Sequence, residues 1–132
     1  MNSVANQVAE KDRVFGKLCS EAEYSYKHEN YFAALACLFI ISEQIIKHSV
    51  DKIDGNFYQA TTDARDKKII DDVEYEMIDN LRQLRNKIFH ENHYSMGIEI
   101  NGKNFPIDED EVKEIIYRKY SERVFILVLR LI

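Results

Sequence analysis

Apolar residues recur every three or four positions over long stretches of the chain, which is the spacing of one face of an α-helix. The pattern predicts a first helix over about residues 10–27 and a second that begins at Tyr31. A third helix is predicted over about residues 63–89, and a last one extends from about residue 110 to the C-terminus. Residues 1–9 are small and polar, so we expect them to be frayed.

The second predicted helix begins with residues that are apolar on every side. Residues 31–41 (YFAALACLFII) include no charged side chain, so a helix there must be covered on all its faces. Such coverage is hard to obtain within one small chain, which favours a second copy as a partner. Ser42, Glu43 and Gln44 then bring polar groups into the same helix. We interpret Glu43 as a surface or capping acid, with a role in a site as the alternative.

The third predicted helix has a regular apolar stripe, formed by Ile70, Val73, Met77, Leu81, Leu84 and Ile88. Before it, residues 51–64 are predicted to be a loop whose polar end, Thr61-Thr62-Asp63, caps the helix. After it, Ile98-Glu99-Ile100 alternates apolar and polar residues and Asn101-Gly102 is a strong hairpin signal. The sequence therefore predicts an all-α protein: one domain over residues 1–132, an antiparallel four-helix bundle with a small β-hairpin insert near 98–107.

Composition agrees with a single helical domain. The 132 residues include one proline and four glycines, are 45% apolar and 31% charged, and carry a formal net charge of −5. This acidic balance argues against a protein that coats long nucleic acids, because phosphate neutralisation drives such binding. Cys19 and Cys37 form no CxxC pair, so we expect both to pack in the core. We find no signal-peptide pattern and no uninterrupted apolar run of membrane-spanning length, and expect a cytoplasmic location without membrane contact.

Candidate chemistry collects near the end of the third predicted helix, in Leu81-Arg82-Gln83-Leu84-Arg85-Asn86-Lys87-Ile88-Phe89-His90. Arg85 offers a planar, permanently charged group that suits a phosphate. His90 is the residue type that exchanges a proton near neutral pH. Asn86 is four residues before His90, so the two are neighbours on a helix. Arg85 and His90 are five apart, about 140° around an unbroken helix, so they meet on one phosphate only if the helix ends or distorts near Phe89, or if two subunits contribute.

This segment resembles the signature of the HEPN superfamily, an arginine followed by a polar residue and, after a short spacer, a histidine. The resemblance implies an all-α domain that dimerises through its motif helices and brings two Arg–His sets into one cleft. It also implies a metal-independent endoribonuclease, typical of toxin–antitoxin and antiphage defence systems, with an antitoxin or defence protein as a further partner. Carried over to this chain, the catalytic residues are Arg85, Asn86 and His90, the substrate is RNA, and no metal or cofactor is needed.

Three alternatives remain open from the sequence. One is a non-catalytic HEPN module that binds RNA, a nucleotide or a protein through the same cleft. Another is a scaffold whose apolar second helix serves assembly alone. In a chain without catalysis, Arg85 and His90 can simply be cations near a helix C-terminus, where the helix dipole favours them. A metal site over residues 90–93 (His-Glu-Asn-His) is the weakest alternative, because no cluster of partner ligands accompanies it.

Overall fold

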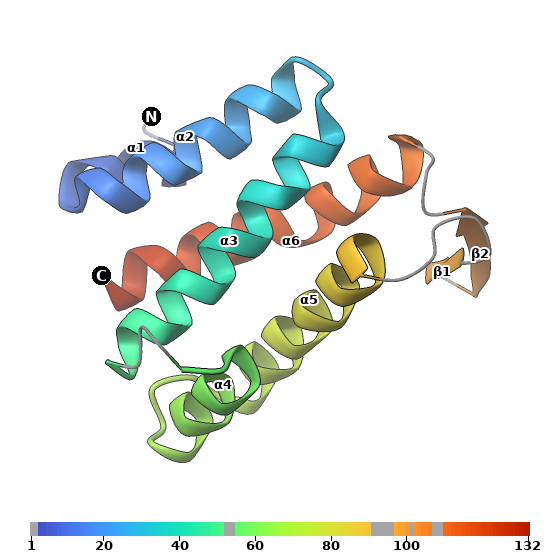
Figure 1. Cartoon of the computed structure of the whole chain (residues 1–132). Helices are drawn as coiled ribbons and strands as arrows, with labels where there is room; N and C mark the ends of the chain where they lie inside the picture. The colour runs from blue at the N-terminus through green and yellow to red at the C-terminus, as the bar shows by residue number, and fades with distance from the viewer. Residues whose placement is uncertain (1–2, 52–54, 91–96, 101, 107–109) are drawn as a thin grey trace.

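The computed structural model describes residues 3–51, 55–90, 97–100, 102–106 and 110–132. Helices form its core, as the sequence predicts for an all-α protein, and Figure 1 shows how they are arranged. Two short strands lie beyond the ends of the helices. The elements in chain order are α1 (Val4–Lys11), α2 (Arg13–Lys27), α3 (Tyr31–Ser49), α4 (Phe57–Asp66), α5 (Asp72–His90), β1 (Gly97–Ile100), β2 (Lys103–Pro106) and α6 (Asp110–Leu131).

The N-terminal segment is helical, so the expectation of a frayed lead-in over residues 1–9 is wrong for its described part. Ser3 caps α1 by accepting a hydrogen bond from the backbone N–H of Asn6. Val8 is fully buried, which anchors the short helix in the core. Asp12 separates α1 from α2 and caps α2, since its carboxylate accepts from the N–H of Phe15 at 2.9 Å. Helical periodicity alone predicts one helix from about residue 10, but the Asp12 cap interrupts it and α2 begins at Arg13.

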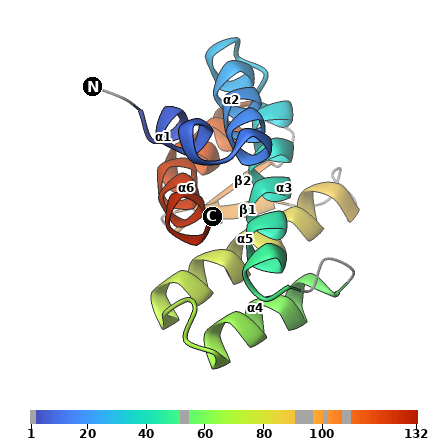
Figure 2. The same ribbon diagram turned by 90° about the vertical axis from the view of Figure 1, so that its left-hand side faces the viewer.

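Gly16 lets α1 fold back against α2. A Cβ built at Gly16 would lie 2.4 Å from the Cα and 2.7 Å from the Cβ of Ala9. Backbone atoms of α1 occupy that space, so no side-chain rotation can relieve the contact. Figure 2 looks towards this end of the molecule and shows α1 in front, beside both α2 and α6.

The central helix is α3, which packs against α2, α6, α4 and α5. Most of its apolar side chains are buried, namely Ala34, Leu35, Leu38, Phe39, Ile41, Ile45 and Ile46. Phe32 and Ile40 are both 49% exposed, so this chain alone does not cover the helix on every side. By length and composition alone α3 would also pass for a membrane span, but core helices of the same kind pass that test too.

The predicted loop over residues 51–64 and the single long helix after it are replaced by two helices. Asn56 caps α4 by accepting from the N–H groups of Tyr58 and Gln59, so Thr61, Thr62 and Asp63 lie inside a helix and cap nothing. The chain leaves α4 through Lys68, whose φ of 59° is left-handed. Because α4 has only four buried residues in ten, its apolar pattern is too sparse to stand out in the sequence.

A reciprocal cap then starts α5. The N–H of Glu74 donates to the Asp71 carboxylate at 2.8 Å, and the N–H of Asp71 donates to the Glu74 carboxylate at 3.0 Å. Arg130 of α6 holds this turn in place, because it donates to the carbonyl of Ile69 at 3.0 Å and pairs with Glu74 at 2.5 Å. The turn is therefore fixed by a residue about sixty positions away.

Most of the predicted apolar stripe of α5 faces the core. Met77, Leu81 and Ile88 are buried, and Leu84 packs against the core while partly exposed. Val73 is 65% exposed and does not belong to the stripe, because α5 begins only at Asp72 and its first turn faces solvent. Ile78 takes a fully buried place that the predicted stripe omits.

The region predicted as a hairpin near 98–107 contains β1 and β2, which pair antiparallel with Ile98 opposite Phe105 and Ile100 opposite Lys103. Gly102 has a φ of 79°, a conformation that favours glycine. Residues 107–109 lie outside the described residues, and Asp110 and Glu111 begin α6.

The contact at Gly16 yields a stability prediction. Gly16→Ala should lower the free energy of unfolding by about 1–3 kcal/mol, as overpacking does, although alanine is the better helix former. Urea denaturation followed by circular dichroism measures it. Ser20→Ala on the exposed face of the same helix is the matched control and should be neutral or slightly stabilising. Equal stability of the Gly16→Ala protein and the wild type would show that α1 does not pack closely on α2.

Candidate functional site

Arg85 reaches from α5 to α3, where its Nη1 donates to the carboxylate of Glu43. The two side chains are partly buried, with 25% and 21% of their surfaces exposed. Glu43 also accepts from the Nζ of Lys47, one helical turn further along α3, at 2.7 Å. We refer to Arg85, Glu43 and Lys47 as the Arg85 cluster. Two cations share one carboxylate there, so the cluster carries a net positive charge next to the contact of α3 and α5.

The guanidinium of Arg85 also has a second neighbour, on α4. Its Cζ lies 5.4 Å from the ring centroid of Phe57, a buried residue at the start of α4. Its Nε is buried and has no hydrogen-bond partner among the described residues. Arg85 thus has donors that Glu43 does not use, in a group whose position is fixed by α3 and α4. A fixed guanidinium with spare donors is suited to bind an anion.

The other two predicted site residues follow on the same helix. Asn86 is partly buried on α5. His90 is the last residue of α5, and its side chain lies outside the described residues. Because α5 is helical through His90, the backbone positions of Arg85 and His90 are about 140° apart around one axis. The sequence required that the helix end or distort near Phe89, or that two subunits contribute; α5 ends at His90, the residue after Phe89, and contribution from two subunits stays a prediction.

Arg82, the neighbouring cation, is engaged on its own helix. Its Nε and Nη2 both donate to the Asp79 carboxylate, at 3.1 and 2.9 Å, and Gln83 donates to the other oxygen of Asp79 at 2.8 Å. Its guanidinium carbon lies 5.1 Å from the ring centroid of Tyr58 on α4. Residues 82–90 contain no acid in sequence, yet two of their cations, Arg82 and Arg85, find a carboxylate in the fold.

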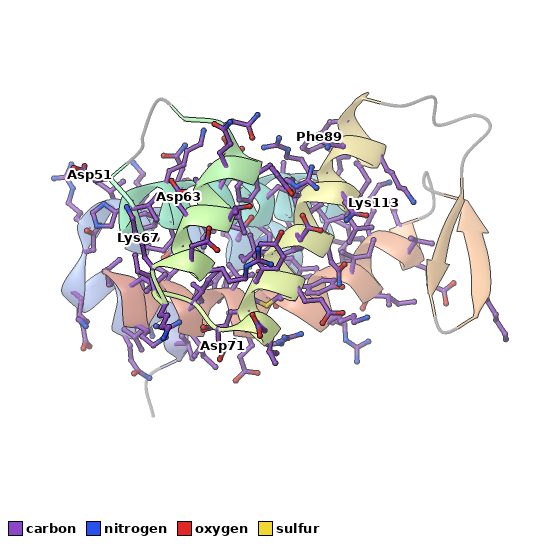
Figure 3. The ribbon with its side chains drawn as sticks, turned by 90° about the horizontal axis from the view of Figure 1, so that it is seen from below. Asp51, Asp63, Lys67, Asp71, Phe89 and Lys113 are labelled. Carbon is purple, nitrogen blue, oxygen red and sulfur yellow. The ribbon has the colours of Figure 1, made fainter. Side chains whose placement is uncertain are left out.

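Three aromatic rings pack together where the C-terminal end of α5 meets α3. The ring of Phe89 lies 5.4 Å from that of Phe32 and 5.6 Å from that of Phe39, both in edge-on geometry. Phe39 is buried, whereas Phe89 is 37% exposed and Phe32 is 49% exposed. Figure 3 shows Phe89 at the end of α5 that lies away from Asp71. We call the exposed apolar side chains Phe32, Ile40 and Phe89 the apolar face.

The sequence identified Arg85 as a candidate and underrated Glu43, which was interpreted as a surface or capping acid. The signal was present: Glu43 and Lys47 interrupt a strongly apolar helix at i,i+4 spacing, and a charge in such a helix needs a partner. Phe57 and Tyr58 were missed because the segment that contains them was predicted to be a loop. Only the folded chain brings α4 against α5.

The cysteines and candidate metal ligands add no further chemistry. Cys19 is fully buried, and burial raises the pKa of its thiol to about 12; Cys37 is partly buried against the core. Both therefore pack as the sequence predicts. Among the residues that the structure describes, no group of three or more histidine, cysteine, aspartate or glutamate side chains is placed to hold a metal ion. The alternative metal site over residues 90–93 falls outside the described side chains.

No protein-family model matches the chain, and no curated protein or solved structure matches it either. The motif and the geometry of the Arg85 cluster are therefore the features that point to a function for this chain.

The shared carboxylate gives a prediction for stability. Glu43→Gln would leave Arg85 and Lys47 close together without their common counter-charge, and should lower the free energy of unfolding by about 1–2 kcal/mol. Thermal unfolding in low salt measures the change. Asp66→Asn is the control, since Asp66 and Arg65 form an exposed pair at 3.8 Å that contributes little. If both variants were as stable as the wild type, the cluster would not be a coupled unit.

Proposed function

We propose that this chain is a homodimeric, metal-independent endoribonuclease of the HEPN type, acting in a toxin–antitoxin or antiphage defence system. In this proposal α2, α3, α5 and α6 form the antiparallel four-helix bundle of that family, and β1 and β2 are its hairpin insert. The observation that carries it is the arginine of the motif, Arg85, which is held across two helices with donors left over, inside a cluster of net positive charge.

The roles follow from what RNA cleavage requires. The 2′-hydroxyl of RNA is its own nucleophile, so the protein must remove its proton, stabilise negative charge on the phosphate and protonate the leaving oxygen. Arg85 would bind the non-bridging oxygens, with Glu43 as its positioning residue and Lys47 adding charge. His90 would be base or acid, and the second subunit's copy would take the other role. Asn86, one turn before His90, would orient the imidazole or the phosphate.

The apolar face supports a dimer. Phe32, Ile40 and Phe89 expose large apolar side chains on α3 and α5, the two helices that also carry Arg85 and Glu43. The rings of Phe32 and Phe89 contact each other, and exposed apolar groups that lie together are typical of interaction sites. A second copy packed there would remove them from water and bring two Arg85 clusters together. That arrangement satisfies the helical geometry, because the arginine of one subunit would work with the histidine of the other.

Cleavage in a chelator tests the proposal. Purified protein incubated with structured RNA in EDTA should produce fragments ending in a 2′,3′-cyclic phosphate. Arg85→Ala and His90→Ala should each reduce the cleavage rate by about 10²–10⁴-fold, the usual effect of removing a charge stabiliser or a general acid–base group. Both variants should still be dimers by light scattering. Arg123→Ala on the exposed face of α6 and His28→Ala after α2 are the matched controls and should cleave at the wild-type rate.

The same measurements separate the alternatives. RNA binding without cleavage would contradict the enzyme and support a non-catalytic HEPN module that binds RNA through this surface. Dimerisation without any effect on RNA would leave a scaffold. The apolar face favours the scaffold as well as the enzyme, so only the loss of cleavage in Arg85→Ala and His90→Ala, with the dimer kept, supports the enzyme.

A growth assay tests the biological setting. Induction of the wild-type chain in a bacterial host should arrest growth, and induction of His90→Ala to the same protein level should not, because only the former would cut cellular RNA. Colony counts after induction measure the difference. Equal growth of the two strains would contradict the toxin role and leave the nuclease itself untouched.

A further inference from the structure

A shallow hollow of about 360 Å³ lies on α4, lined by Tyr58, Gln59, Thr62 and Asp63. Its volume falls at the lower end of the range of small-molecule sites. All four lining residues lie on one face of the helix, at i, i+1, i+4 and i+5. Figure 3 shows α4 beside α5, with Asp63 labelled. The hollow is therefore on the helix that covers Arg82 and Arg85.

Three arginine–aromatic contacts fix α4 against α5. Phe57 lies under Arg85, Tyr58 under Arg82, and Arg65 lies over the ring of Tyr75 at 4.1 Å. The residue numbers of the partners increase along α4 while they decrease along α5, so the two helices are antiparallel. Tyr58 thus has a defined place next to Arg82, one helical turn from Arg85.

Tyr58 offers a flat surface in the hollow. Its side chain is 49% exposed even though Arg82 lies 5.1 Å from its ring centroid, and Arg82 is itself held by Asp79. An exposed tyrosine beside a fixed guanidinium is a stacking surface for an aromatic ligand, because bases stack on both tyrosine rings and arginine planes.

Two polar side chains line the hollow next to the Tyr58 ring. Gln59 is exposed and its amide can both donate and accept hydrogen bonds. The Thr62 hydroxyl oxygen is buried and has no hydrogen-bond partner in the described part of the chain. A buried hydroxyl without a partner is costly and is satisfied when a ligand supplies one. A stacking ring with amide and hydroxyl groups on one side is the arrangement that recognises the edge of a nucleobase.

We propose that this hollow is a nucleobase subsite, in which one base of a single-stranded RNA segment stacks on Tyr58 and hydrogen-bonds to Gln59 and Thr62. The inference rests on the proposed function, since it assigns the substrate of that site. Side chains at Arg82 and Arg85 are about 5–6 Å apart at their Cβ atoms, as for any i,i+3 pair. A phosphate on Arg85 would therefore be within about one nucleotide of a base on Tyr58. Tyr58 would select where the strand is bound, without touching the reacting phosphate.

A binding cycle tests the subsite. The His90→Ala protein, which should be catalytically inactive, is titrated with a labelled single-stranded oligoribonucleotide. It is also titrated with versions of that strand in which one nucleotide, at each position in turn, is abasic. At one position the abasic change should weaken binding by about 5- to 150-fold, the effect of losing one stacked base. With Tyr58→Ala added, that same change should have no further effect. Tyr58→Phe should keep the wild-type pattern, and Tyr24→Ala, which removes an exposed tyrosine from α2, is the matched control.

The outcomes distinguish the subsite from the nuclease. Equal abasic penalties with and without Tyr58, or no RNA binding at all, would overturn the subsite. Cleavage by the wild type in EDTA is measured alongside and reports on the nuclease alone. Coupling between Tyr58 and one base without cleavage would support the subsite and contradict the enzyme. Cleavage without such coupling would support the enzyme and overturn the subsite. Circular dichroism of each variant checks that α4 stays folded.

Discussion

The burial of α3 is the constraint on which the rest of the structure depends. The first eleven residues of this helix include no charge, and an apolar helix in water is stable only when other elements cover it. Helices α2 and α6 make the most extensive contacts with it, and α4 and α5 also pack against it. What these helices leave uncovered, Phe32 and Ile40, forms the apolar face with Phe89. The positions of α2, α4, α5 and α6 can be understood from that requirement, whereas α1 packs on α2 and α6.

The same constraint gives the charged residues of α3 their importance. Glu43 and Lys47 occur where the helix is already partly enclosed, so each needs a counter-charge at close range. They pair with one another, and Glu43 also receives Arg85 from α5. This contact fixes the motif arginine to the central helix. A residue that is interpreted from sequence as a surface acid thereby becomes the group that positions the candidate phosphate-binding arginine.

How far the fold was predictable depended on the strength of the local pattern. Helices α2, α3, α5 and α6 carry broad apolar stripes, and the sequence identified each of them, although not the starts of α2 and α5. Helix α4 is short and mostly polar, so it resembled a loop, and the break before α5 was hidden because Ile70 continued the apolar spacing across it. The turn is fixed by Asp71 with Glu74 and by Arg130 from the far end of the chain. Local periodicity carries no information about such a contact.

The sequence by itself determined the all-α class, the place of the core stripes and the candidates Arg85, Asn86 and His90. These follow from spacing and residue type, which are local properties. Only the tertiary structure decided that Glu43 and Phe57 hold Arg85, that Tyr58 lies beside Arg82, and that Val73 faces water. Those facts depend on how helices far apart in sequence pack, and packing is set by the shapes and charges of whole faces together. For the candidate site, the chain supplied the chemical groups and the fold supplied their neighbours.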